Sequence, residues 1–173
     1  MDALQFIDFL KKENLYETAE KYHPLFQSIF KKNLEVKPHE EILIVGDVGQ
    51  PQKRVPAIVL GSYLLAAKRL GLKHKFVVQS PKEKGEVAED QILEALLNHS
   101  EGNIILWVLS GKIGSLDFLG RSFRKFVQSK KHRFISTPSL GLLKTSQTND
   151  FMKALDVNYD KMQEDGKRIK AVM

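Results

Sequence analysis

The stretch Glu41-Ile-Leu-Ile-Val-Gly-Asp47 decides the fold class of this chain. Its four consecutive apolar residues include three β-branched ones, and the run ends at a glycine followed by an aspartate. A strand that is covered on both faces needs apolar side chains at every position, unlike a strand with one face in water. We therefore expect a buried parallel strand over 41–46, with the loop from Gly46 to Arg54 at its carboxyl end.

Strand-like and helix-like segments alternate after this strand. Val55 to Leu70 has the length and apolar density of a long helix, and Gly71 follows it as a helix-ending glycine. Further strands are expected over 75–79, 103–109 and 133–136, with helices over 87–97 and 116–128 between them. This alternation predicts an α/β fold, a doubly wound, mainly parallel sheet of about four strands with helices on both faces.

The pattern divides the chain into three segments. Residues 1–34 carry helical stripes and are expected to pack on the domain as N-terminal helices, residues 35–137 form the α/β core, and residues 138–173 are an irregular segment followed by C-terminal helices. Either Thr148 or Asn149 is expected to cap the first C-terminal helix. The helical pattern runs on to Met173, which fits a natural terminus and the cut end of a longer protein equally well.

Two of the helices allow more detailed expectations. The helix over 55–70 is apolar around nearly its whole circumference, so it must be covered on both sides. The sheet covers one side, and either a helix from 1–34 or a partner subunit covers the other. In the helix over 87–97, Leu97 is expected to face inward along with Ile92, Leu93 and Leu96.

Composition excludes several classes of protein. With no cysteine there is no disulfide, thiolate zinc site, iron–sulfur cluster or cysteine nucleophile. The N-terminus lacks the cationic and apolar regions of a signal peptide, and charged residues interrupt every apolar run before it reaches the length of a membrane span. We therefore expect a cytoplasmic protein without membrane contact.

The basic surplus of the chain is densest over residues 120–133. The formal net charge is +6, and this stretch holds six lysines and arginines and no acid. On a helical wheel Phe123 and Phe126 fall on the inner side and the cations on the outer side, so no aromatic surface is left for stacking bases. We expect a solvated basic face, and nucleic acid is not the favoured partner.

The loop from Gly46 to Arg54 is the candidate ligand site, because open α/β sheets bind ligands beyond the carboxyl ends of their strands. Gly46 and Gly49 would give backbone access, Asp47 a hydrogen-bond acceptor, and Lys53 with Arg54 exposed positive charge at a helix N-terminus. The loop is expected to face residues 110–115, where Ser115 would cap the next helix. Its spacing matches neither a dinucleotide nor a Walker fingerprint, so it predicts an anion without identifying it; the alternative is a plain turn.

The chain offers no catalytic or metal-binding motif. Its five histidines are scattered singly, and no His-Glu-x-x-His sequence occurs. We therefore expect no catalytic residue, metal site or cofactor within these 173 residues.

In the order of its segments, nearly the whole chain resembles the N-terminal domain of the thermophilic-type metallo-aminopeptidase (leucyl aminopeptidase-like) family. The motifs are Arg133-Phe-Ile-Ser-Thr-Pro138 and, after it, Asp150-Phe-Met-Lys-Ala-Leu-Asp-Val-Asn-Tyr159-Asp-Lys-Met162. In that family an arginine, a Ser/Thr-x-Pro turn and a short helix with Met precede a long helix that opens on Asp-Tyr-x-x-Met. Here Asn158 takes the place of the acid. The upstream order is also similar, with Val36-Lys-Pro38 before the strand at 41–45 and a long helix ending in Lys-Arg-Leu-Gly71.

The resemblance implies a Rossmann-like, non-catalytic domain of a peptide-cleaving metallohydrolase, contributing to the substrate cleft or to an oligomer contact in a homo-oligomer. In that family the Glu, His and Asp ligands of the divalent metal ions lie in a downstream domain, and none has a counterpart here. The chain alone is then expected to be inactive. The alternative is a self-contained α/β module that binds an anionic ligand or nucleic acid.

Overall fold

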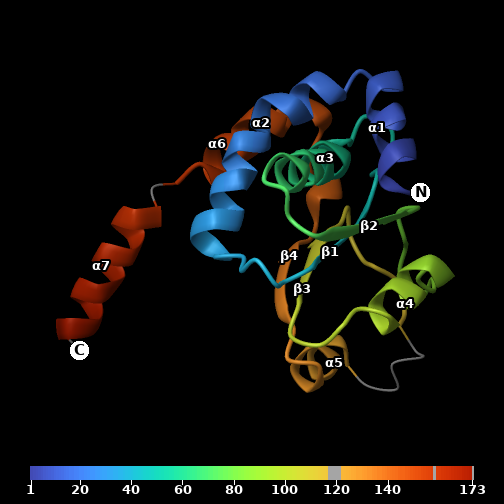
Figure 1. Ribbon diagram of the computed structural model, residues 1–173. Coiled ribbons are helices and arrows are strands. Elements are labelled where there is room, and N and C mark those ends of the chain that lie inside the picture. Colours follow the sequence, from blue (N-terminus) through green and yellow to red (C-terminus); the bar gives the residue numbers. More distant parts are fainter. Residues whose placement is uncertain (117–121, 158, 173) are drawn as a thin grey trace.

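The computed structural model describes residues 1–116, 122–157 and 159–172, and its centre is a four-stranded, all-parallel sheet. The strand order is β2-β1-β3-β4. The strands are β1 (Ile42–Asp47), β2 (His74–Gln79), β3 (Ile104–Val108) and β4 (Arg133–Thr137), each within a residue or two of its predicted position. The α/β fold class predicted from the alternating pattern is confirmed (Figure 1).

The direction of winding reverses in the middle of the sheet. β1 pairs with β2 on one side and with β3 on the other, so the chain passes from β2 back across β1 to reach β3. The carboxyl ends of β1 and β3 therefore form the point at which an open α/β sheet has room for a ligand.

Helices cover both faces of the sheet (Figure 1). α3 (Val55–Arg69) lies on one face, and α4 (Asp90–Leu97) with α5 (Phe123–Ser129) lies on the other. Successive residues of β1 alternate between the two cores: Ile42 and Ile44 pack with α3, whereas Leu43 and Val45 pack with α4 and α5. Both sets must be apolar, which explains the continuous apolar run in the sequence.

A second helical layer covers α3. Every residue from Val55 to Ala67 is buried, because α1 (Ala3–Lys12) and α2 (Tyr16–Ser28) cover the side of α3 that faces away from the sheet. α2 continues as a short π-helix, Ile29–Asn33. At Gly61 the helices approach so closely that a Cβ atom would lie 2.6 Å from Leu10 Cδ1. The additional cover that α3 requires therefore comes from helices of its own chain.

The C-terminal segment runs over the carboxyl edge of the sheet and then leaves it. Two 3₁₀ turns, Leu140–Leu142 and Thr145–Gln147, lead into α6 (Thr148–Leu155). α6 lies beside α2, where the Tyr22 hydroxyl donates to Asn149 Oδ1. α7 (Tyr159–Val172) stands away from the rest of the chain (Figure 1).

Several predicted helix ends and caps were wrong. α4 begins at Asp90 rather than at 87, because Val87 forms a β-bridge with Ser115. Leu97 is 57% exposed instead of facing inward. Ser122, not Ser115, caps α5, and the residue before α6 is Gln147, not Thr148 or Asn149. Residues 117–121 of the predicted helix over 116–128 lie outside the described residues.

Within the described ranges, no helix combines the length and the apolar character needed to cross a bilayer.

Candidate functional site

Asp47 joins the carboxyl ends of β1 and β3. Its side chain is fully buried: Oδ1 accepts a hydrogen bond from the Gly49 N–H (2.8 Å), and Oδ2 accepts from the Ser110 N–H (2.8 Å) and hydroxyl (3.0 Å). Burial raises the pKa of Asp47, while the hydrogen bonds from Ser110 and Gly49 act in the opposite direction. The two loops face each other as predicted, with the Asp47 carboxylate linking them.

The C-terminal segment lies against the carboxyl end of β3. Leu140 N–H donates to Leu109 O (3.2 Å), and Gly141 N–H donates to Ser110 O (2.8 Å). A Cβ atom at Gly141 would lie 2.7 Å from Ser110 O, so only glycine fits this approach. The protein's own chain therefore packs directly on the segment that follows β3.

Gly46 and Gly49 also face protein at short range. A Cβ atom at Gly46 would lie 2.6 Å from Val108 O on the neighbouring strand. Gly49 has a φ of +65°, and a Cβ atom there would lie 2.3 Å from Lys53 O. Both glycines permit close backbone packing within the protein, and ligand access at them stays a prediction.

Arg54 turns into the protein, contrary to the expectation of an exposed charge. Its side chain is only 16% exposed. Nη1 donates to Gly49 O (2.7 Å) and Val48 O (3.2 Å), and Nη2 lies 3.2 Å from the Glu13 carboxylate. The guanidinium also lies over the Phe9 ring, 5.3 Å from its centroid. The arginine therefore ties the loop after β1 to α1.

Lys53, by contrast, lines an open cavity of about 420 Å³ at the carboxyl edge of the sheet. The cavity lies between two segments, 51–53 and 144–146. Two hydrogen bonds hold these segments together: Thr145 N–H donates to Gln52 O (2.8 Å), and Arg54 N–H donates to Thr145 Oγ1 (2.8 Å). Its lining residues are Pro51, Gln52, Lys53, Lys144, Thr145 and Ser146.

The chemistry of this lining favours an anion. It contains two lysines, two hydroxyls and one amide, and no aspartate or glutamate. Ammonium and hydroxyl groups donate strong hydrogen bonds to carboxylate or phosphate oxygens. α3 begins at Val55 next to the cavity, and the positive end of the helix dipole acts in the same direction. We call these six residues the lysine cavity.

The sequence pointed to half of this cavity. Lys53 was one of the predicted site residues, but Lys144 belongs to a segment identified only as irregular. The signal that could have found it is positional: residues 138–147 follow the fourth strand, so they must return over the same edge of the sheet as the loop after the first strand.

The described residues contain no group of three or more His, Asp or Glu side chains placed to hold a metal ion.

Comparisons of the chain with protein-family models, with curated proteins and with solved structures found no match.

Proposed function

We propose that this chain is a non-catalytic α/β domain of an aminopeptidase-like metallohydrolase and that its lysine cavity holds an anionic group of the ligand. The observation that carries the proposal is the pairing of Lys53 with Lys144 in a cavity that no acidic residue lines. A peptide substrate has such a group in its terminal carboxylate, so the domain would form one wall of the substrate cleft.

One feature of the structure supports a link to the aminopeptidase-like family. α7 carries Met162 and Ile169, which are 58% and 63% exposed, on a helix that stands away from the sheet (Figure 1). Exposed apolar side chains seven residues apart lie on one helix face, which a further folded unit would cover.

Under this proposal the metal ions are bound by a downstream domain. Metal-dependent hydrolysis needs several convergent ligands, and the described part of the chain supplies no such group. Purified residues 1–173 should therefore hydrolyse no aminoacyl substrate and bind no divalent metal tightly. Metal-dependent aminopeptidase activity in this chain would contradict the proposal, as would a parent reading frame without a downstream His/Glu/Asp cluster.

Calorimetric titration tests the anion site. We expect an N-acetylated tripeptide with a free carboxylate to bind, and Lys53→Ala or Lys144→Ala to weaken binding roughly tenfold, which corresponds to about 1.4 kcal/mol for one charge-assisted hydrogen bond. Lys84→Ala, an exposed lysine outside the lysine cavity, serves as the control. Equal binding by the wild type and both cavity variants would show that the lysines do not hold the anion.

The second candidate function is a self-contained module for a free anion, and the same lining, with two lysines and no acidic side chain among the described residues, favours it. Titration with inorganic pyrophosphate distinguishes the two candidate functions. Strong, salt-dependent binding of pyrophosphate with no binding of the peptide carboxylate would favour the self-contained module.

A further inference from the structure

The outer edge of β2 has backbone groups that the sheet does not use. β2 is an end strand of the sheet. Ile42 N–H donates to Lys73 O. In a parallel ladder this bond means that the backbone N–H and C=O groups of the odd-numbered residues of β2 point toward β1. The N–H and C=O groups of His74, Phe76 and Val78 therefore point outward from the edge.

Met1 already occupies one end of this edge. Val78 N–H donates to Met1 O (3.2 Å), and the Met1 ammonium donates to Val78 O (3.0 Å) and to Gln91 Oε1 (3.2 Å). This two-way exchange is the bonding of an antiparallel strand pair, made by a single residue. The edge thus accepts an added strand at Val78, while α1 leads the chain away before it reaches Phe76 and His74.

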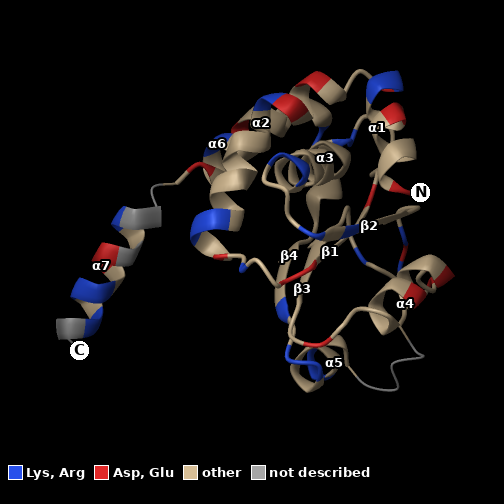
Figure 2. Cartoon of the chain, in the orientation of Figure 1, with Lys and Arg blue, Asp and Glu red and all other residues tan. Residues whose placement is uncertain are grey.

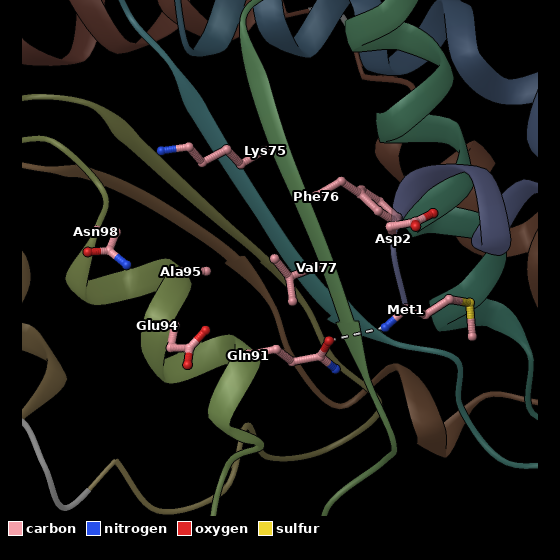
Figure 3. Close-up of a pocket in the computed structure, with 9 residues that line it drawn as sticks. All are labelled: Met1, Asp2, Lys75, Phe76, Val77, Gln91, Glu94, Ala95 and Asn98. Carbon is pink, nitrogen blue, oxygen red and sulfur yellow. Dashed lines mark hydrogen bonds between the residues drawn. The ribbon is translucent and has the colours of Figure 1, made fainter.

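A cavity of about 370 Å³ lies over the unused stretch. Figure 3 shows β2 with side chains of α4 on one side and Met1 and Asp2 on the other. Val77 and Ala95 are the small apolar side chains in its lining. Gln91 and Glu94 are the polar side chains contributed by α4, and Asn98 directly follows that helix. The cavity therefore has the edge of β2 at its base and α4 along its length.

The lining of this cavity carries two cations, the Met1 ammonium and Lys75, and two carboxylates, Asp2 and Glu94. α4 carries Asp90 and Glu94 and no lysine or arginine (Figure 2). The Asp2 carboxylate is engaged by the N–H groups of Leu4 and Gln5, and Lys75 Nζ lies 3.1 Å from the Glu41 carboxylate. Glu94 is exposed and remains the acidic group in the lining that is free to meet a cation.

A second copy of this chain is a poor occupant of the edge. An antiparallel pairing through His74 and Phe76 would set Lys75 directly opposite Lys75 of the second copy, and like charges directly opposite are destabilising. The occupant therefore differs from β2 in sequence.

We propose that the outer edge of β2 at His74–Phe76 binds an extended peptide segment of another protein, which adds a strand to the sheet and sets a lysine or arginine against Glu94. Backbone hydrogen bonds would provide the affinity, and the acidic side of α4 would provide the preference for basic residues. The inference does not depend on the lysine cavity, which lies at the carboxyl edge of the sheet between other loops.

The test uses a displayed library of random linear twelve-residue peptides selected on the intact chain. Two variants, each with a matched control, test separately the contributions of backbone hydrogen bonds and of charge to peptide binding. His74→Pro removes one outward N–H at the first residue of an edge strand, where proline is tolerated, and His74→Ala keeps that N–H. Glu94→Lys reverses the charge of the cavity, and Asp8→Lys makes the same change at an exposed position of α1 outside the cavity.

We expect peptides rich in lysine, arginine and β-branched residues to be enriched. Binding of a selected peptide should weaken at least tenfold in His74→Pro and Glu94→Lys and change little in His74→Ala and Asp8→Lys. Amide exchange at Phe76 should slow when the peptide is bound. The proposal is overturned if no peptide is enriched, if acidic peptides are enriched, if His74→Pro binds as His74→Ala does, or if the free chain forms a dimer that His74→Pro abolishes.

Discussion

Lys53 and Arg54 are neighbours in sequence with opposite environments. Lys53 is exposed at the lysine cavity, whereas the Arg54 guanidinium bonds two carbonyls of its own loop and the Glu13 carboxylate. The sequence places both cations correctly at the carboxyl edge of the sheet. It could not show which of them turns inward, because that depends on Phe9 of α1 and on Glu13 directly after this helix, about forty residues away along the chain.

Single substitutions should separate the two cations. We expect Arg54→Ala to lower the free energy of unfolding by roughly 1–3 kcal/mol, because it leaves carbonyls and a carboxylate without their donor. Lys53→Ala should change it by less than about 0.5 kcal/mol, as exposed substitutions usually do. Urea denaturation measures both. Equal effects of the two substitutions would contradict the inward role of Arg54.

At the scale of elements, segments that are apolar at nearly every residue could be predicted from the sequence, whereas the ends of helices could not. The buried strand at 42–47 and the fully covered α3 follow from unbroken apolar patterns, which hold whatever the neighbours are. The start of α4 depends instead on the bridge between Val87 and Ser115, a pairing between distant segments that no local pattern contains. The Asp47–Ser110 link joins segments 63 residues apart and was predicted only as two loops that face each other.

The contact of α1 and α2 with α3 can be tested at Gly61. A Cβ atom there would lie 2.6 Å from Leu10 Cδ1 and 3.1 Å from Ala19 Cβ, so Gly61→Ala should push the outer helices away and cost about 1–3 kcal/mol of stability. Gly166→Ala is the matched control, because nothing lies within 4 Å of that position on α7. It should raise helicity slightly without loss of stability. A Gly61→Ala variant as stable as the wild type would show that this packing yields easily.

For the whole molecule, the helices and strands up to α6 contribute side chains to the two hydrophobic cores, whereas α7 contributes to neither. No described residue of α7 joins either core cluster, and the helix stands away from the sheet (Figure 1). A helix of fourteen residues that joins neither core is marginal in water.

Removing residues 158–173 should therefore leave the stability of the remainder nearly unchanged. We expect the melting temperature of residues 1–157 to stay within about 2 °C of that of the full chain, since surface changes away from packing contacts are nearly neutral. Thermal unfolding followed by circular dichroism measures this. A large fall in melting temperature would mean that α7 packs on the body in solution, and the further folded unit proposed to cover it would lose its main structural argument.

Acid should weaken the fold through a buried pair of histidines. His99 follows α4, His132 follows α5, and their rings stack with centroids 5.1 Å apart. His99 Nε2 lies 3.1 Å from Ile104 O, and His132 Nδ1 lies 3.3 Å from Asn103 O. Burial lowers the pKa of both imidazoles, and the charge of His132 lowers the pKa of His99 further.

The sign of the pH dependence follows from these lowered pKa values. Below the ordinary histidine pKa of 6.5 the unfolded chain takes up protons that the folded chain refuses, so the free energy of unfolding falls as the pH drops through this value toward the lower folded ones. We expect the chain to be less stable in urea at about pH 5.5 than at about pH 7.5, and His132→Phe, which keeps an aromatic ring beside His99, to flatten the slope. His39→Gln, at an exposed histidine, is the control and should keep the wild-type slope. The raised pKa of Asp47 acts in the opposite direction in every variant, so it cancels when slopes are compared. A His132→Phe slope equal to that of the wild type would show that the histidine pair does not set the acid sensitivity of the fold.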